Sequence, residues 1–491
     1  MSTRRLVVWI TFLAVFAMAA RVSVDTDTWW HLRAGEWMIE HRRILQADPF
    51  SYTRGGAAWR YPGWLVQIPL ALVYRGLGPG GLNLWVAGMV TLAFWFVYRT
   101  MEGGVFTKAF VMVLAAAAAG VYWAARPYMV TFVLTAVFLW ILEDFRKGKR
   151  DRLWWLPVLM VLWANSHGGF AAGFLLWGVY LVGAGVLWVR DRRRVVSAIE
   201  PSKIEDRTSK ISRLIVVGAL LVAAVALNPS GPAMLLYPFK TVSIGALRDF
   251  IQEWQSPNFH EARVQPFAWM LLLTLGAVGA SRKGLRLEEF LLVAGFGYMG
   301  LLAARNVALF ALVAAPVLSR HASAVLDRAA QTLGVRPPRL GRVRSRLQGW
   351  VNRALLGVLL LAVGVKMALV FPPAENENAF RQFLPLEAVA FLQETRPPGR
   401  LFNSYNWGAY LLWALPEYPV FVDGRTDLYN DEIIDQWFQV ARAEAGWEQV
   451  LARWEVNLVL IEANAPLARV LEAENWRLLY ADEMAVVYGR E

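Results

Sequence analysis

The chain has 491 residues, of which 57% are hydrophobic and only 18% charged, and its mean hydropathy is +0.38. Soluble domains carry roughly a quarter charged residues, so this composition excludes an ordinary soluble protein and predicts one that crosses a membrane several times. The formal net charge of +12 would suit nucleic-acid binding in a soluble protein, but here Lys and Arg stand in short loops between apolar runs, so we expect no nucleic-acid partner.

Apolar stretches recur along the chain to residue 371, and a helix needs about 17 to 25 residues to cross a bilayer. The first stretch resembles a signal peptide, but its apolar core is long and further spans follow, so we expect an uncleaved anchor. We predict eleven membrane-spanning helices, at residues 5–24, 81–98, 109–125, 128–142, 153–165, 170–189, 214–229, 265–280, 287–303, 306–319 and 354–371.

Runs of Lys and Arg between these spans indicate which side each loop faces. Short cytoplasmic loops are enriched in both residues, so the following runs should lie inside: residues 2–5, 144–152, 190–213, 281–286 and 320–353. One apolar stretch, residues 63–74, is left over. We expect it to lie along the interface or to re-enter, since a crossing would put the basic loop at 144–152 outside. This topology predicts a multi-pass protein of the cytoplasmic (inner) membrane, with the N-terminus inside and the chain from Pro372 onward outside.

The uncommon polar residues of the apolar part gather on the outer side of this topology. Of the five histidines, only His321 lies inside. Two outer segments, residues 25–62 and 230–264, are too long for simple turns, and the first suits an amphipathic helix lying on the membrane. We therefore predict a site at the outer face, near the following residues: Asp25, Asp27, His31, His41, Arg126, Asn165, His167, Asn228, Glu253, His260 and Arg305.

Acids and arginines together suggest group-transfer chemistry. A carboxylate can take a proton from an acceptor hydroxyl, while arginines stabilise the charge that develops on a phosphate leaving group. Arg126 and Arg305 each stand at the outer end of a span, where an unpaired arginine is costly, and this favours bidentate binding of a lipid-linked phosphate or pyrophosphate. No glycine-rich nucleotide motif occurs in a strand-turn-helix context, so a nucleotide-sugar or ATP mechanism is not expected.

Several of these residues also have a purely structural interpretation. Trp29 and Trp30 suit an interfacial aromatic belt without any further function. Asp25 could be a solvated residue or a helix cap. His167 could be hydrogen-bonded at a span end, next to two glycines that ease helix packing.

The chain changes character after residue 371. Residues 372–491 contain nine Arg, no Lys and 19 acidic residues, a net charge of −10, so the preceding part carries +22. Strand patterns alternate with helical ones, which predicts a small α/β domain, with strands near residues 400, 419–423, 456–463 and 484–490 and helices near 407 and at 431–444 and 467–476. The segment VDGRTDLY places Asp423, Arg425 and Asp427 where such sheets bind ligands, or else makes Asp423 and Arg425 a structural pair.

Asp27 and the segment TWWHLRAGEWMIEH that follows it resemble the acidic motif in the first outer loop of the C-type (GT-C) glycosyltransferases. These multi-span enzymes use polyprenyl-phosphate-linked sugars and include the protein mannosyltransferases and the aminoarabinose transferases. Segments along most of the chain are similar to those of a poorly characterised bacterial group of the superfamily: DTDTWWHLRAG, DPFSYT, WANSHGGF, NPSG, EWQSPNF, RNVALF, YNWGAYLLW and VDGRTDLY. The resemblance implies an all-α polytopic membrane bundle of about eleven transmembrane helices, residues 1–371, with a small extracytoplasmic α/β domain, residues 372–491.

In that superfamily an acidic residue directly after the first span acts as the base or orients the acceptor. The resemblance therefore implies a membrane glycosyltransferase that moves a sugar from a polyprenyl-phosphate donor to a glycan, lipid or protein acceptor, with Asp27 and Asp25 as catalytic residues. The acids of better-known members are adjacent, whereas Thr26 separates them here, and we favour Asp27 as the base because the helix-like stretch after it aligns best. The predicted substrate-binding residues are His31, Arg126, Asn165, His167, Glu253 and Arg305.

No cofactor is expected besides the lipid-linked donor substrate. The chain lacks cysteine, which excludes thiolate metal sites. Asp25, Asp27, His31 and Glu253 could hold a divalent ion, but several members of the superfamily use no metal, and we favour a metal-free site. Two alternatives stay open: a non-catalytic membrane protein, either a lipid-linked-glycan transporter or a cell-envelope scaffold, and an oligosaccharide ligase. The lack of an internal repeat and the gathering of charges at one face favour the enzyme over a carrier.

Overall fold

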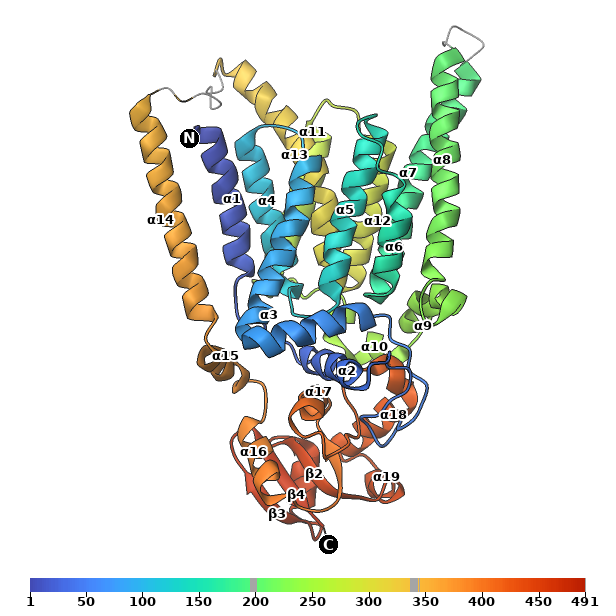
Figure 1. Ribbon diagram of the computed structural model, residues 1–491, viewed down its shortest axis with the longest axis vertical. Coiled ribbons are helices and arrows are strands. Elements are labelled where there is room, and N and C mark those ends of the chain that lie inside the picture. Colours follow the sequence, from blue (N-terminus) through green and yellow to red (C-terminus); the bar gives the residue numbers. More distant parts are fainter. Residues whose placement is uncertain (195–200, 336–342, 344, 491) are drawn as a thin grey trace.

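The computed structural model describes residues 1–194, 201–335, 343 and 345–490, and its two parts are stacked along the long axis (Figure 1). One part is a bundle of long helices, and the other is a small domain built around a sheet. The bundle helices coincide one to one with the eleven predicted spans, and they are α1 (Thr3–Ala19), the second part of α3 (Trp64–Thr100), α4 (Val105–Ala119), α5 (Tyr128–Arg146), α6 (Trp155–Ala164), α7 (Ala171–Arg194), α8 (Pro201–Val225), α11 (Gln265–Ala280), α12 (Leu287–Leu302), α13 (Val307–Thr332) and α14 (Arg346–Val370).

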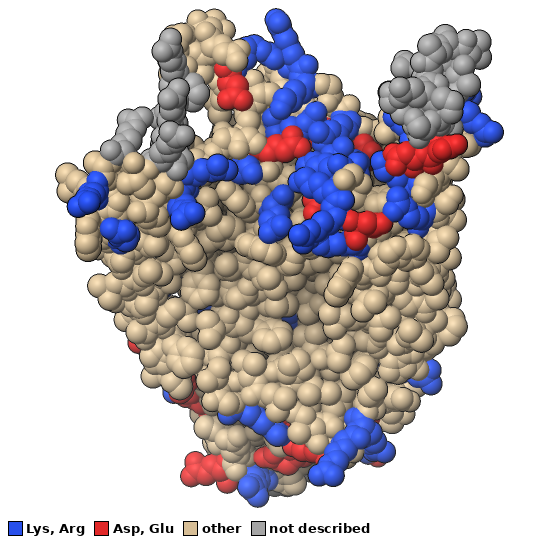
Figure 2. All heavy atoms as spheres, turned by 45° about the horizontal axis from the view of Figure 1, so that its top comes forward, with Lys and Arg blue, Asp and Glu red and all other residues tan. Residues whose placement is uncertain are grey.

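The bundle is that of a multi-pass membrane protein. Within the described residues, seven helices are long and apolar enough to cross a membrane, while α6 and α11 are shorter apolar helices. Many Lys and Arg side chains gather at the end of the bundle that lies away from the C-terminal domain, above a broad uncharged band (Figure 2). Residues 195–200, 336–342 and 344 of the predicted basic loops lie outside the described part. The count of eleven spans stays a prediction.

The leftover apolar stretch at 63–74 forms the first part of α3, which runs across the end of the bundle (Figure 1). The helix then turns along the bundle at Gly78, whose φ of 61° and ψ of −160° favour glycine strongly. Pro79 follows at the start of the second part, where a missing N–H costs nothing. The chain can therefore turn sharply here from the end of the bundle into a membrane-spanning direction.

A mixed four-stranded sheet of order β1-β2-β4-β3 forms the centre of the C-terminal domain. β1 (Arg400–Asn403) and β2 (Val456–Glu462) are parallel, whereas β4 (Ala485–Gly489) is antiparallel to both β2 and β3 (Arg477–Ala481). A parallel pair needs a long crossover, which helices supply between β1 and β2. The helices of the domain are α15 (Pro373–Phe380), α16 (Leu386–Thr395), α17 (Tyr405–Ala414), α18 (Thr426–Ala441), α19 (Trp447–Arg453) and α20 (Pro466–Leu471).

The prediction of a strand at residues 419–423 is wrong. Val420 pairs instead with Ser51 of the first outer loop in an isolated parallel bridge, and the Tyr52 N–H donates to the Val420 carbonyl at 3.2 Å. An apolar run has the same pattern whether its partner is a sheet or a loop. Strand β3, at residues 477–481, was not predicted because most of its side chains are at least partly exposed and show no alternation.

Helix α2 (Thr28–His41) lies between the bundle and the C-terminal domain (Figure 1). Trp29 is 5% exposed, and its ring packs edge-on against Phe380 and Tyr410, with centroids 5.3 and 5.1 Å apart. Trp30 is 4% exposed. The interpretation of these two tryptophans as anchors in the membrane interface is therefore wrong, because protein covers the face of α2 that the sequence pattern assigned to lipid.

Arg425 fastens the C-terminal domain to the first outer loop. Its fully buried guanidinium lies 2.7 Å from Asp423 Oδ2 and 2.6 Å from Asp48 Oδ1. It also lies over the rings of Phe50 and Trp59, 5.3 and 4.9 Å from their centroids. The structural interpretation of Asp423 and Arg425 as an ion pair is thus confirmed, with Asp48 as a third member that holds the loop.

We expect Arg425→Met to destabilise the protein by about 3–5 kcal/mol, because it leaves two carboxylates buried without their cation. The loss should appear as a lower midpoint of thermal unfolding in detergent and as faster proteolysis of the C-terminal domain. Arg469→Met, on the exposed face of α20, is the matched control and should change neither. Equal midpoints for the two variants would contradict the assigned role of Arg425.

Candidate functional site

A cavity of about 300 Å³ lies where the end of the bundle, α2, the second outer loop and the C-terminal domain meet. The second outer loop contains α9 (Tyr237–Val242), α10 (Gly245–Phe250) and the short helix η5 (Gln252–Trp254). Two more short helices, η2 (Gly168–Phe170) and η6 (Ala304–Asn306), precede α7 and α13. Six of the eight predicted site residues line this cavity: Asp27, His31, Arg126, His167, Glu253 and Arg305.

Arg126 holds three carboxylates at the cavity wall. It stands in the turn before α5, and its Nε lies 3.3 Å from Asp25 Oδ2, its Nη1 2.7 Å from Asp27 Oδ2 and its Nη2 2.9 Å from Glu253 Oε2. Each nitrogen of the guanidinium is therefore paired with an acid. One cation thus joins the loop after α1, the start of α5 and η5.

Arg305 makes fewer ion pairs than Arg126. Its Nη1 lies 3.3 Å from Glu253 Oε1, and its guanidinium lies over the Trp254 ring, 4.3 Å from the centroid. A hydrogen bond from the Ala304 N–H to the Gln255 carbonyl, at 2.9 Å, brings η6 beside η5 and so places Arg305 near Glu253. With 22% of its side chain exposed, Arg305 offers N–H groups to the cavity.

The two aspartates after α1 have different surroundings. Asp25 Oδ1 accepts a hydrogen bond from the Asp27 N–H at 3.0 Å and so closes a local turn. Asp27 is the residue that precedes α2, yet its carboxylate makes no capping hydrogen bond. Asp27 lines the 300 Å³ cavity, whereas Asp25 lines a separate one of about 380 Å³. A substrate in the 300 Å³ cavity would therefore meet the carboxylate of Asp27.

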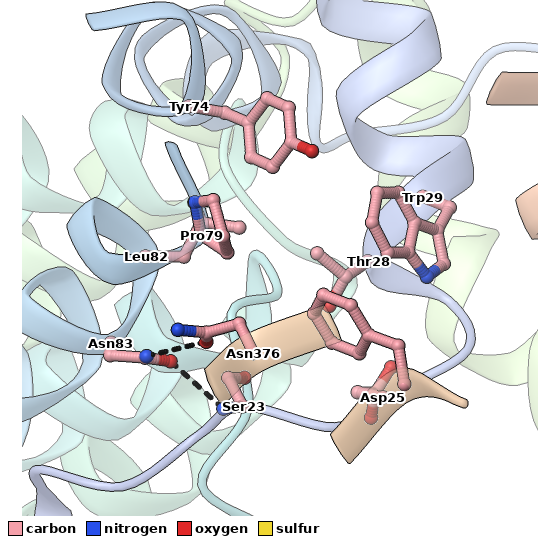
Figure 3. A pocket seen from close by; sticks show the side chains of 10 residues that line it. Ser23, Asp25, Thr28, Trp29, Tyr74, Pro79, Leu82, Asn83 and Asn376 are labelled. Atoms are coloured by element: carbon pink, nitrogen blue, oxygen red, sulfur yellow. Dashed lines mark hydrogen bonds between the residues drawn. The ribbon is translucent and has the colours of Figure 1, made fainter. Parts of the chain in front are cut away.

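A small pocket beside Asp25 shows how this loop is held (Figure 3). Asn83 of α3 accepts a hydrogen bond from the Ser23 N–H at 2.8 Å and donates one to Asn376 of α15 at 2.8 Å. The pocket measures about 10 Å³, room for a single water at most. It belongs to the packing that positions Asp25 and holds no substrate.

Burial raises the pKa of Asp27 to about 7; Arg126 opposes this rise, while the negative charges of Asp25 and Glu253 add to it. Burial would also raise the pKa of Glu253, but Arg126 and Arg305 outweigh it and lower that pKa to about 2. At neutral pH Glu253 is therefore a fixed anion, whereas Asp27 is near its midpoint. A carboxylate with that pKa can both accept and release a proton.

His167 presents a neutral ring to the cavity. Its Nδ1 accepts a hydrogen bond from the Gly169 N–H at 2.9 Å and lies 2.8 Å from Thr131 Oγ1, which itself accepts from the Trp163 indole N–H. This pattern assigns the ring proton to Nε2. Burial and the charges of Arg305 and Arg126 lower the pKa of His167 to about 3. The residue is thus a hydrogen-bond donor at physiological pH and carries no charge.

Asn165 lies apart from the cavity lining. Its Oδ1 accepts from the Trp64 indole N–H at 2.9 Å, and its Nδ2 donates to the Val161 and Leu227 carbonyls at 2.8 and 3.1 Å. The side chain joins α6 to α3 and to the chain just after α8, which is a structural role. Three further polar residues of the outer face also lie outside the lining: His41, Asn228 and His260.

The carboxylates that could hold a metal ion face Arg126 instead. His31, the remaining candidate ligand, has its Nδ1 3.1 Å from Gln67 Nε2 and its ring centroid 3.5 Å from that of Trp30, with the two ring planes tilted by 36°. Among the described residues, no group of three or more His, Asp or Glu side chains is arranged to hold a metal. The donor set therefore does not fit a divalent ion as it stands.

Part of the lining was missed by sequence reasoning. Aromatic residues from both outer loops contribute, as do residues of the C-terminal domain: Trp30, Tyr61, Tyr237, Trp254, Gly424, Thr426 and Asp427. Gly424 lies so close to Asp27 that a Cβ there would overlap the carboxylate. The sequence had named Asp427, in the segment VDGRTDLY, as a possible ligand-binding residue of the C-terminal domain, but it did not assign that residue to this cavity.

No protein-family model matches the chain, and no curated protein matches its sequence. Solved structures are similar in fold. The archaeal oligosaccharyltransferase AglB from Archaeoglobus fulgidus, in complex with an inhibitory peptide and a dolichol-phosphate, aligns with a TM-score of 0.57 at 11% identity, over 98% of this chain and 74% of that one. An oligosaccharyltransferase structure from the same organism, tethered with an acceptor peptide, aligns with a TM-score of 0.56 at 13% identity over the same shares.

A third structure, ArnT from Cupriavidus metallidurans bound to undecaprenyl phosphate, has a TM-score of 0.49 at 15% identity, over 98% of this chain and 97% of that one. The two higher-scoring alignments extend over the bundle and the C-terminal domain alike. Identities this low show the fold and leave the substrates to be argued from the site. The chain therefore has the fold of the C-type (GT-C) glycosyltransferases.

Proposed function

We propose that the chain is a membrane glycosyltransferase that moves a sugar from a polyprenyl-phosphate donor to a glycan, lipid or protein acceptor at the extracytoplasmic face. The observation that carries this proposal is the pairing of Asp27 with Arg126 at the wall of a cavity between the bundle and the C-terminal domain. The positive-inside rule assigns this end of the bundle to the outside of the cytoplasmic membrane. The GT-C fold supports glycosyl transfer as the reaction class.

In the proposed reaction Asp27 is the general base. It takes the proton of an acceptor hydroxyl as the hydroxyl oxygen forms a bond to the anomeric carbon of the donor sugar. The bond from that carbon to the phosphate oxygen breaks, and the polyprenyl phosphate leaves with the electron pair. A pKa of about 7 suits Asp27 to this task, because the carboxylate is ionised in a large fraction of molecules and still basic enough to accept the proton. Asp25, with its oxygen engaged in the local turn, positions Arg126 and Asp27.

Arg305 and His167 are proposed to bind the phosphate. Arg305 has N–H groups that are not engaged by Glu253, and His167, whose ring proton is on Nε2, lines the same cavity. Each nitrogen of the Arg126 guanidinium pairs with an acid. We therefore propose that Arg126 positions these carboxylates and does not contact the phosphate. Donors fixed before the reaction stabilise charge on a leaving group without reorganisation.

We further propose that the reaction needs no metal ion, because the Arg126 guanidinium already supplies a positive charge to the acids that would be ligands. Three carboxylates from two segments converge on it, and His31 Nδ1 is engaged by Gln67. A divalent ion at this place would have to displace a buried arginine.

An oligosaccharide ligase is a second candidate. The two solved structures with the higher TM-scores are oligosaccharyltransferases, and the same outer cavity would serve the transfer of a preassembled glycan. The two candidates differ in the size of the transferred group, so the product's mass distinguishes them.

Asp27→Asn should lower the rate of sugar transfer about 10²–10⁴-fold, the usual contribution of a general base. Asp25→Asn should cause a smaller loss, and His260→Asn, on the exposed part of the second outer loop, should cause none. The measurement is transfer from a panel of labelled polyprenyl-phosphate sugars by membranes that contain each variant. If both aspartate variants transfer sugar at the parental rate, Asp27 is not the base.

The pH dependence of transfer should follow the ionisation of Asp27. Because a protonated carboxyl cannot accept the acceptor's proton, kcat/KM should rise with pH and level off above about pH 7. Glu253→Gln removes a neighbouring negative charge and releases Arg126, so it should lower the pKa of Asp27 and move the acid limb to lower pH. Glu261→Gln, in the same loop but outside the cavity lining, should leave the limb in place, and an unmoved or upward-shifted limb in Glu253→Gln contradicts the assignment.

Metal independence predicts that transfer persists after treatment with EDTA and that the purified parental protein gives no bound Mn²⁺ signal in electron paramagnetic resonance. Arg126→Ala should gain one Mn²⁺ site, since three carboxylates lose their cation at once. Arg263→Ala, a paired arginine of the second outer loop, should bind none. Loss of transfer with EDTA, or stoichiometric Mn²⁺ on the parental protein, would overturn the proposal.

A further inference from the structure

Asp427 brings a carboxylate of the C-terminal domain into the cavity, and the proposed reaction does not use it. It lies in the first turn of α18. Its Oδ2 lies 3.3 Å from the Trp59 indole nitrogen and 3.1 Å from the Tyr237 hydroxyl, both of which donate to it. Its Oδ1 accepts no hydrogen bond from another described residue. One oxygen is thus fixed by two neutral donors, and the other remains as an acceptor.

Asp427 differs in this respect from the other acids of the cavity. Asp27 and Glu253 pair with arginines, whereas the charge closest in sequence to Asp427, Arg425, is already bound to Asp423 and Asp48. A partly buried carboxylate without a cation is costly unless hydrogen bonds satisfy it. A ligand with a neutral group that donates a hydrogen bond to Asp427 Oδ1 would satisfy this acceptor.

The surroundings of Asp427 are aromatic. Trp59 stacks on Tyr61 with ring centroids 5.7 Å apart, and Trp30 packs against both rings at 5.6 and 5.0 Å. The indole N–H of Trp30 is buried and has no hydrogen-bond partner among the described residues. This wall therefore combines an unpaired acceptor, an unpaired donor and flat apolar rings.

We propose that Asp427, with the aromatic residues Trp30 and Tyr61, forms a binding site for a sugar ring. A sugar hydroxyl donates to Asp427 Oδ1, and the apolar face of the ring lies on the aromatic side chains. Recognition of this kind is selective, because a ring that lacks the hydroxyl leaves the buried acceptor unpaired. The inference rests on the proposed function only for the sugar's place in a transfer reaction, as part of either the donor or the acceptor.

Saturation-transfer NMR on the full chain in lipid nanodiscs tests the site without any turnover. The probes are the methyl glycosides of glucose, galactose, mannose and arabinofuranose. We expect the parental protein to bind at least one of them, and Asp427→Asn to bind it about 10- to 100-fold more weakly, since a charged acceptor is lost. In that variant the Trp59 and Tyr237 donors hold the amide oxygen and turn its NH₂ toward the cavity.

Asp435→Asn is the matched control, because Asp435 lies on the same helix with its side chain exposed. It should bind the glycoside like the parental protein. Tyr61→Leu is a second variant that removes a ring face, leaves the two donors to Asp427 in place and should weaken binding severalfold. Thermal unfolding shows whether each variant is folded. Parental affinity in folded Asp427→Asn, or no binding of any probe by the parental protein, would overturn the proposal.

Farnesyl phosphate and farnesyl phosphate carrying the bound sugar identify the source of the ring. If the sugar belongs to the donor, Asp427→Asn weakens binding of the glycosylated lipid and leaves farnesyl phosphate unaffected. If it belongs to the acceptor, the variant weakens only the methyl glycoside. The transfer assay with the Asp27 variants tests the proposed reaction, whereas the binding measurements with Asp427→Asn test the sugar site. Failure of one proposal can therefore be distinguished from failure of the other.

Discussion

The site depends on the shared ion pairing of Arg126. Three carboxylates, from Asp25, Asp27 and Glu253, meet one guanidinium, and Arg305 adds a second cation on the side of Glu253 alone. Acids this close cannot all ionise freely in a poorly hydrated place. Glu253, with two cations, keeps its charge at any physiological pH. Burial and the neighbouring acids instead raise the pKa of both Asp25 and Asp27, that of Asp27 to about 7. A pKa near neutral is what the proposed role of Asp27 as a base requires.

This arrangement requires that the C-terminal domain be docked. Gly424 lies directly against Asp27, and Arg425, one residue later, locks the domain to the first outer loop through Asp48. The same docking covers Trp29 and Trp30 of α2. A carboxylate that protein covers on this side is shielded from water, which strengthens its interaction with Arg126 and raises its pKa at the same time.

The cavity has two chemically different walls. The bundle and the second outer loop supply the charged side chains Arg126, Arg305 and Glu253. Elsewhere in the lining, neutral donors from both outer loops, Trp59 and Tyr237, surround Asp427 of the C-terminal domain. A lipid-linked sugar has the same division, since its phosphate is anionic and lies next to the membrane and its sugar is neutral and lies beyond.

The sequence by itself determined the eleven helices of the bundle and the position of the acids after α1 at the end of the bundle away from the basic loops, because hydropathy and loop charge are local properties of the chain. It also identified six side chains of the cavity. Only the tertiary structure decided that Arg126 binds acids, that Asn165 joins helices, that residues 419–423 pair with a loop, and that Asp427 enters the cavity. These contacts join segments far apart in sequence, such as Asp48 and Arg425, and depend on which surfaces pack together. A local pattern of polar and apolar residues does not indicate which distant segment it will contact.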